Sequence, residues 1–208
     1  MNNPWEEIEL QAYESHMALD SVGQLQAMNA MMRQQFAACP AETVMILGVA
    51  GGNGLEHAGR MGFTKVYGVD INPCYLQACR ERYPQLQDVL ETVCADLLEE
   101  KLQLPHADLL MANLLVEYIG YAPFQKAVEH IAPRYVSCGI QINDGESFVS
   151  DSPYLHVFDR LDEVHHQMEE TALTEAMSRI GYHACLREER RLPNGKKLVR
   201  LDFGRTDI

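Results

Sequence analysis

The chain has 208 residues, of which 47% are hydrophobic, and this suffices for one globular domain with a full apolar core. Acidic residues outnumber basic residues by 30 to 17, which gives a formal net charge of −13. Proteins that bind nucleic acids gain much of their affinity from Lys and Arg contacts to phosphates. The composition therefore disfavours nucleic acid as a partner and favours a small-molecule substrate. The basic residues within 187–200 fit the solvated faces of a terminal hairpin.

No apolar run is long enough to span a bilayer. The first basic residue is Arg33, and several acidic residues precede it, which is unlike a secretory or organellar targeting peptide. We therefore expect a cytoplasmic protein. The six cysteines are scattered without a C-x-x-C pair, which predicts reduced thiols and no metal site.

Residues 1–40 are predicted to form a helical cap, and residues 41–208 the main domain of a single globular unit. Within the cap, apolar side chains recur at intervals of three and four residues, which lays a stripe along one helix face. The stripe consists of Val22, Leu25, Met28 or Asn29, Met32 and Phe36. Pro40 ends this predicted helix.

From residue 43 the sequence alternates between short β-branched or apolar runs and helical runs. Strands are predicted at 43–49, 65–69, 90–94, 107–112 and 135–142, and helices at 55–61, 74–82 and 124–131. Strands that alternate with helices at this spacing predict a mostly parallel, doubly wound sheet with helices on both faces.

The end of the chain breaks this alternation. A long helical stretch is predicted over 162–180, followed by strand-like runs at 182–192 and 197–203. Asn194-Gly195 between the two runs is a strong signal for a β-hairpin. The expected fold class is therefore α/β, with a seven-stranded, mostly parallel sheet, an antiparallel C-terminal hairpin and an N-terminal helical extension.

A glycine-rich turn over residues 48–54 follows the first predicted strand, and Asp70 ends the second. Glycines let a backbone approach a ligand closely, and doubly wound sheets bind ligands at the carboxyl ends of their strands. Asp70 follows Gly54 by sixteen residues (70 − 54), near the roughly twenty-residue gap of nucleoside-binding units, whose acid accepts hydrogen bonds from ribose hydroxyls. A plain tight turn or a helix N-cap explains either feature alone, but the two together favour a nucleoside.

These features resemble the class I S-adenosylmethionine-dependent methyltransferases over residues 44–142, and the terminal hairpin matches the family's last two strands. The resemblance implies a Rossmann-like methyltransferase domain, S-adenosylmethionine as cofactor and an unidentified methyl acceptor. The glycine-rich turn matches the family's first motif, Asp70 its ribose-binding acid, 94–97 its adenine-binding segment, and 108–115 its fourth-strand motif near the methionine end of the cofactor. The implied cofactor-binding residues are Gly48, Ala50, Gly52, Gly54, Asp70, Ile71, Ala95, Asp96, Leu97 and Asn113.

Two positions depart from the family pattern. Gly48 replaces the acid that usually helps to hold the cofactor's amino group, and Ala50 replaces the first glycine. Asn113 or an N-terminal residue is a candidate replacement for the acid, and a non-catalytic S-adenosylmethionine-binding module is an alternative function. An NAD-dependent oxidoreductase is a weaker alternative, because its G-x-G-x-x-G fingerprint requires glycine where His57 stands.

The catalytic residues cannot be assigned from the sequence, because methyl transfer requires mainly near-attack geometry and needs a base only where the acceptor loses a proton. Glu117 and Tyr118 follow the fourth predicted strand, and Asn143 and Asp144 end the fifth. Each of these pairs is expected at the ligand-binding edge, but each also fits an ordinary cap or turn.

Three further segments bear on the acceptor. Enzymes of this family that methylate nucleobase or glutamine amines carry Asn/Asp-Pro-Pro-aromatic after the fourth strand, whereas Leu114-Leu115-Val116 follows Asn113 here. The long connection over 145–160 is either a functional loop or a surface loop anchored by its aromatic residues, with Phe148, Tyr154, His156 and Phe158 as candidates. Residues 13–17, with Tyr13 and His16, are expected either as a lid over the cofactor or as the start of a packing helix with Ser15 as its N-cap.

Overall fold

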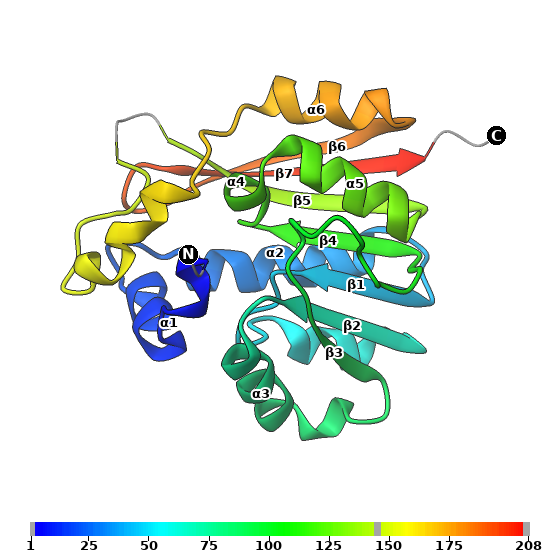
Figure 1. Ribbon diagram of the computed structural model, residues 1–208, viewed down its shortest axis with the longest axis horizontal. Helices are drawn as coiled ribbons and strands as arrows, with labels where there is room; N and C mark the ends of the chain where they lie inside the picture. The colour runs from blue at the N-terminus through cyan, green and yellow to red at the C-terminus, as the bar shows by residue number, and fades with distance from the viewer. Residues whose placement is uncertain (1–2, 144–146, 206–208) are drawn as a thin grey trace.

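The computed structural model describes residues 3–143 and 147–205, and in these residues seven strands form one sheet of order β3-β2-β1-β4-β5-β7-β6 (Figure 1). Strands β1 to β5 are parallel, β7 pairs antiparallel with β5, and β6 pairs antiparallel with β7. The strands are β1 Thr43–Leu47, β2 Lys65–Asp70, β3 Leu90–Cys94, β4 Leu109–Asn113, β5 Tyr135–Ile142, β6 Tyr182–Arg191 and β7 Lys197–Arg205. The predicted fold class is confirmed.

Six α-helices and four 3-10 helices surround the sheet in the described part of the chain. The α-helices are α1 Leu10–Ala18, α2 Gln24–Ala38, α3 Pro73–Arg82, α4 Val116–Ile119, α5 Tyr121–Ile131 and α6 Glu170–Arg179. The 3-10 helices are η1 Pro4–Glu6, η2 Leu55–Arg60, η3 Pro84–Leu86 and η4 Leu155–Glu163.

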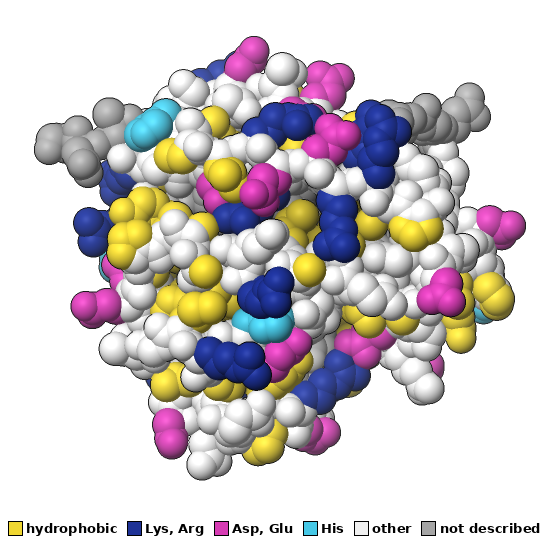
Figure 2. Space-filling model, turned by 180° about the vertical axis from the view of Figure 1, so that it is seen from behind, with side chains coloured by type: hydrophobic (Ala, Val, Ile, Leu, Met, Phe, Trp, Pro, Cys, Tyr) yellow, Lys and Arg dark blue, Asp and Glu magenta, His cyan; other side chains and the backbone are white. Residues whose placement is uncertain are grey.

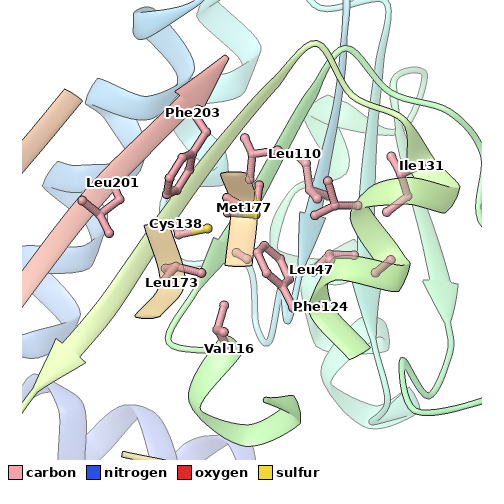
Figure 3. Close-up of a cluster of buried hydrophobic side chains, with 14 of the residues drawn as sticks. Leu47, Leu110, Val116, Phe124, Ile131, Cys138, Leu173, Met177, Leu201 and Phe203 are labelled. Atoms are coloured by element: carbon pink, nitrogen blue, oxygen red, sulfur yellow. The ribbon is translucent and has the colours of Figure 1, made fainter. Parts of the chain in front are cut away.

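Side chains of the central strands alternate between two cores, one on each face of the sheet, as the two-residue period of a strand requires. On β1, Met45 and Leu47 belong to the core beneath α5 and α6, whereas Val44 and Ile46 belong to the core beneath α2, η2 and α3. Figure 3 shows the first of these cores, in which Phe124 of α5 and Met177 of α6 pack toward the sheet.

The order of the strands reverses between β1 and β4, and at such a switch point the loops at the carboxyl ends of the strands separate to form a crevice. The N-terminal segment and η4 lie at this edge of the sheet, on the left of Figure 1. Ile8 packs there against Phe158 and Leu161 of η4, and Glu7 forms an ion pair with Arg160.

The predicted helix over 162–180 is wrong in its first half. Residues 155–163 form η4 instead, and α6 begins only at Glu170. Between them the His166 backbone N–H donates to the Glu117 carbonyl oxygen at 2.6 Å, and Tyr121 Oη contacts the Glu169 backbone. These contacts to α4 and α5 replace the helical hydrogen bonds of the segment. The other predicted elements are present, with ends that shift by up to three residues.

Several basic residues of the C-terminal hairpin are paired with acids. Arg187 bonds Glu170 at 2.6 Å and Glu189 at 2.9 Å, and the buried guanidinium of Arg200 bonds Asp202. On the face opposite to that of Figure 1, Lys and Arg side chains are interspersed with Asp and Glu (Figure 2). Among the described residues, no helix is both long enough and apolar enough to cross a membrane.

Candidate functional site

The glycine-rich turn after β1 owes its path to positive backbone angles. The strand ends at Leu47 because Gly48 takes a φ of +68°, and Gly52 and Gly54 follow with +84° and +96°. Such angles favour glycine. A Cβ on Gly52 would lie 2.8 Å from side-chain atoms of Leu55 and Tyr83, so this glycine also lets the turn pack closely on its surroundings.

Asp70 connects the tip of β2 to that turn. One carboxylate oxygen accepts a hydrogen bond from the Ala50 backbone N–H at 2.8 Å, and the other accepts from the Asn72 N–H at 3.0 Å. The residue is 9% exposed, and burial raises the pKa of its carboxyl, whereas the backbone hydrogen bonds oppose this rise. Since each oxygen has a second lone pair, the carboxylate can still accept hydrogen bonds from a ligand.

A cavity of about 700 Å³, including its open mouth, lies at this edge of the sheet. Eight of the ten residues predicted for the cofactor line it, namely Gly48, Ala50, Asp70, Ile71, Ala95, Asp96, Leu97 and Asn113. Gly52 and Gly54 do not line it. Their role in the structure is to shape the turn that carries Gly48 and Ala50.

The electrostatic character of this first cavity is acidic. Of the charged residue types, only Asp70 and Asp96 line it among the described residues, and no Lys or Arg does. Apolar side chains such as Ile71 and Leu97 form much of the remaining wall. The cavity therefore suits a ligand with a flat apolar group, hydroxyls and a positive charge better than one rich in phosphate.

The side chain of Asn113 is already engaged beneath the cavity. Its amide and that of Gln35 form a reciprocal pair, with Nδ2 to Oε1 at 2.8 Å and Nε2 to Oδ1 at 2.9 Å. Gln35 is fully buried on α2 and also bonds Ser137 Oγ at 2.9 Å. The sequence carried no signal for this pairing, because Gln35 lies beside the apolar stripe of its helix. The pairing fixes the orientation of Asn113.

The N-terminal segment supplies part of the cavity wall. Trp5 makes edge contacts with the rings of Tyr13 and Tyr118, at centroid distances of 5.5 Å and 4.9 Å. The Trp5 carbonyl accepts a hydrogen bond from Asn72 Nδ2 at 2.9 Å, which anchors the segment to the loop after β2. Ser15 lies inside α1, whose N-cap is Glu9, so the prediction of Ser15 as an N-cap is wrong.

A second cavity, of about 490 Å³ including its open mouth, adjoins the first. The two share Trp5, Tyr13, Leu114 and Tyr118, and of these the sequence had not singled out Trp5 for either cavity. Of the residues suggested for the acceptor, the second cavity is lined by Glu117, Tyr118, Phe148, Phe158 and His16. It also contains Gln141 and His165, which sequence reasoning missed.

The remaining acceptor candidates lie elsewhere. Asn143 accepts a hydrogen bond from Gln141 Nε2 at 2.7 Å and supports the second cavity without lining it. Tyr154 and His156 line neither of the two cavities. Asp144 lies outside the described residues.

Glu117 is the one carboxyl group among the described residues that line the second cavity. It is 4% exposed, and burial raises its pKa to about 7. Oε1 accepts a long hydrogen bond, 3.4 Å, from the Gln141 backbone N–H, and Oε2 has no partner among the described residues. Burial also lowers the pKa of both His16 and His165, which favours neutral imidazoles. The cavity thus contains a carboxyl group that can give or take a proton near neutral pH.

Comparison with known proteins relates this geometry to one family. Residues 46–133 match the family model described as a methyltransferase domain. No curated protein sequence matches the chain.

Solved structures share its fold at low identity. Magnesium protoporphyrin IX methyltransferase from Synechocystis PCC 6803, with bound SAH, has a TM-score of 0.65 at 14% identity and covers 89% of this chain and 84% of its own. Geranyl diphosphate C-methyltransferase from Streptomyces coelicolor A3(2) has a TM-score of 0.66 at 11% identity and covers 87% and 77%. The [4+2]-cyclase SpnF has a TM-score of 0.65 at 9% identity and covers 86% and 80%.

Proposed function

We propose that the chain is a class I S-adenosylmethionine-dependent methyltransferase that binds this cofactor in the first cavity and methylates a small molecule held in the second. The observation that carries the proposal is that Asp70 and the turn at Gly48 and Ala50 meet on one cavity wall at the switch point of the sheet.

The described residues fit the cofactor. We assign the ribose hydroxyls to Asp70, whose oxygens keep free lone pairs, and the adenine to the wall formed by Ile71, Ala95 and Leu97, with Asp96 at its amine. Gly48 has no side chain, and a Cβ at this position would lie 3.2 Å from the side chain of Leu115. The glycine therefore leaves space at the cavity wall. When bound, S-adenosylmethionine supplies a methyl group on a positively charged sulfur, and an acidic cavity without Lys or Arg among its described lining residues suits that charge.

Gly48 cannot supply the acid that usually holds the cofactor's amino group. We propose that Asn113 and the N-terminal segment take over this end of the site. Gln35 holds the Asn113 amide in one orientation, and Asn3, Trp5 and Tyr13 close the wall from the other side.

The oxidoreductase alternative is disfavoured by the same geometry. Dinucleotide-binding folds place the pyrophosphate at the N-terminus of the helix after the glycine turn. Here the turn leads into η2, a six-residue 3-10 helix, and no Lys or Arg among the described residues lines the cavity. The second cavity argues against a non-catalytic module, because it places a titratable carboxyl group next to the cofactor site.

Calorimetry with S-adenosylhomocysteine tests the proposal. We expect saturable binding of this compound and none of NAD or ATP. Asp70→Asn should weaken the affinity by about tenfold to a hundredfold, because it removes a charge-assisted hydrogen bond. The control is Asp88→Asn, which alters an exposed acid away from the cavity and should bind like the unmodified chain. Absence of heat with the unmodified chain at saturating concentration would exclude the proposed function. The cytoplasmic location stays a prediction.

A further inference from the structure

One carboxylate oxygen of the buried residue Glu117 has no hydrogen-bond partner in the part of the chain that the structure describes. Oε2 is the one buried side-chain oxygen or nitrogen without a hydrogen bond among the described residues. A buried polar group without a partner costs about 1–3 kcal/mol. Because Glu117 lines a cavity, an oxygen in this state points to a ligand group that donates a hydrogen bond to it.

The amide and imidazole groups of three side chains that line this cavity are bonded to other partners than Oε2. The amide nitrogen of Gln141 bonds Asn143 Oδ1 at 2.7 Å and the Phe148 carbonyl at 2.9 Å. Gln24 Nε2 bonds Gln141 Oε1 at 2.9 Å, and His16 Nδ1 bonds Ser152 Oγ at 2.8 Å. No hydrogen bond from these three side chains reaches Oε2, so this oxygen remains available to a ligand.

Aromatic rings form the other walls of the second cavity. Phe148 stacks on His165 at a centroid distance of 3.8 Å, and Phe158 lies 4.9 Å from the ring of His16. No Lys or Arg lines the cavity in the described part of the chain. The ammonium of Lys196 donates to the Phe148 carbonyl instead. An anionic acceptor would therefore meet a carboxylate and find no cation among the described residues of the cavity wall.

We propose that the second cavity takes a compact, uncharged aromatic or heteroaromatic acceptor with one O–H or N–H group, and that Glu117 Oε2 receives the proton of that group. This inference rests on the proposed function. In the transfer, the acceptor's oxygen or nitrogen forms a bond to the methyl carbon, and the methyl–sulfur bond breaks with its electron pair on sulfur. The acceptor's O–H or N–H bond breaks, and its proton passes to Glu117.

The probes are p-cresol, which carries the donor, and 4-methylanisole, in which a methyl group replaces the phenolic hydrogen. Binding is followed by NMR titration with and without saturating S-adenosylhomocysteine, at about pH 5.5 and about pH 7.5. Because only the ionised carboxylate accepts strongly from a neutral phenol, the affinity for p-cresol should rise about tenfold with pH. At the higher pH, 4-methylanisole should bind at least about tenfold more weakly than p-cresol, because it has no hydrogen to donate to the carboxylate.

Other titratable groups near Glu117 are controlled by variants. They comprise Tyr13 and His16 on α1, Tyr118 on α4, Cys138 on β5, His165 and His166 before α6, and Lys196. Glu117→Gln retains all of them, so it should bind p-cresol without the pH-dependent gain. Glu129→Gln, an exposed change on α5, should behave like the unmodified chain.

The outcomes separate this inference from the proposed function. Equal binding of the two probes, a pH response that persists in Glu117→Gln, or no binding of either probe would overturn the inference while binding of S-adenosylhomocysteine stood. Failure to bind S-adenosylhomocysteine, with p-cresol bound as expected, would overturn the proposed function and the transfer step, and would leave only the class of ligand that the second cavity takes.

Discussion

Replacement of Glu117 by glutamine should stabilise the protein at alkaline pH and have little effect at acidic pH. Burial raises the pKa of this carboxyl from 4.5 to about 7 in the folded chain. The folded state therefore holds the proton more tightly than the unfolded state. Stability that is fully present below about pH 4.5 is lost as the pH rises through about 7, because ionisation then places an unpaired charge in the interior. Glutamine cannot ionise, so the variant escapes this loss.

The expected size follows from the shift in pKa. A rise of about 2.5 units, at 1.36 kcal/mol per unit, corresponds to roughly 3 kcal/mol above about pH 8. The side chain is 4% exposed, so solvent screening takes little from this value. For a chain of this length, roughly 3 kcal/mol corresponds to a rise in Tm of about 6–12 °C.

Urea unfolding at about pH 5 and about pH 8 measures the difference between the two proteins. At the lower pH, both the protonated Glu117 and the glutamine that replaces it have a buried hydrogen-bond donor without a partner at this position. The free energies of unfolding of the two proteins should therefore agree within about 1 kcal/mol. Glu129→Gln controls for the loss of one negative charge and should follow the unmodified chain at both values. An advantage of Glu117→Gln that does not change with pH would refute the reasoning, because it would show that Glu117 carries no buried charge.

Two further predictions concern the turn and the N-terminal segment. Gly52→Ala should lower the free energy of unfolding by about 1–3 kcal/mol, because its Cβ would collide with Leu55 and Tyr83. Gly62→Ala has a similar φ of +75° with open space around it, so urea unfolding of this control isolates the smaller backbone cost. Saturating S-adenosylhomocysteine should slow proteolysis within residues 3–18, which line the first cavity through Asn3, Trp5 and Tyr13. Equal cleavage with and without the compound would count against a lid.

The architecture was predictable because it depends on local patterns. Short apolar runs separated by helical runs specify a parallel sheet, and Asn194-Gly195 specifies the final hairpin. Asp70 and the glycine turn could be placed together because the carboxyl ends of adjacent parallel strands meet at one edge.

The second cavity was predictable only in part, because its walls come from segments far apart in the sequence. Gln24, Glu117, Phe148 and His165 meet there only after folding. The same contacts explain the wrong prediction of a helix over 162–180, since the His166 N–H bonds the Glu117 carbonyl outside any helix. No periodicity in the sequence reports such a tertiary hydrogen bond.

Asp70 and Glu117 show how one sheet edge gives two carboxyl groups different roles. Burial raises the pKa of both, but Asp70 accepts two short backbone hydrogen bonds, whereas Glu117 accepts one long bond from Gln141. Hydrogen bonds to a carboxylate favour its charged form. At Asp70 these bonds oppose the effect of burial and orient the carboxylate, whereas the pKa of Glu117 is raised to about 7, close to the balance between its two protonation states. The short backbone hydrogen bonds from the turn at Ala50 and the loop at Asn72 therefore suit Asp70 to the proposed binding role, and their absence at Glu117 suits this residue to the proposed role of proton acceptor.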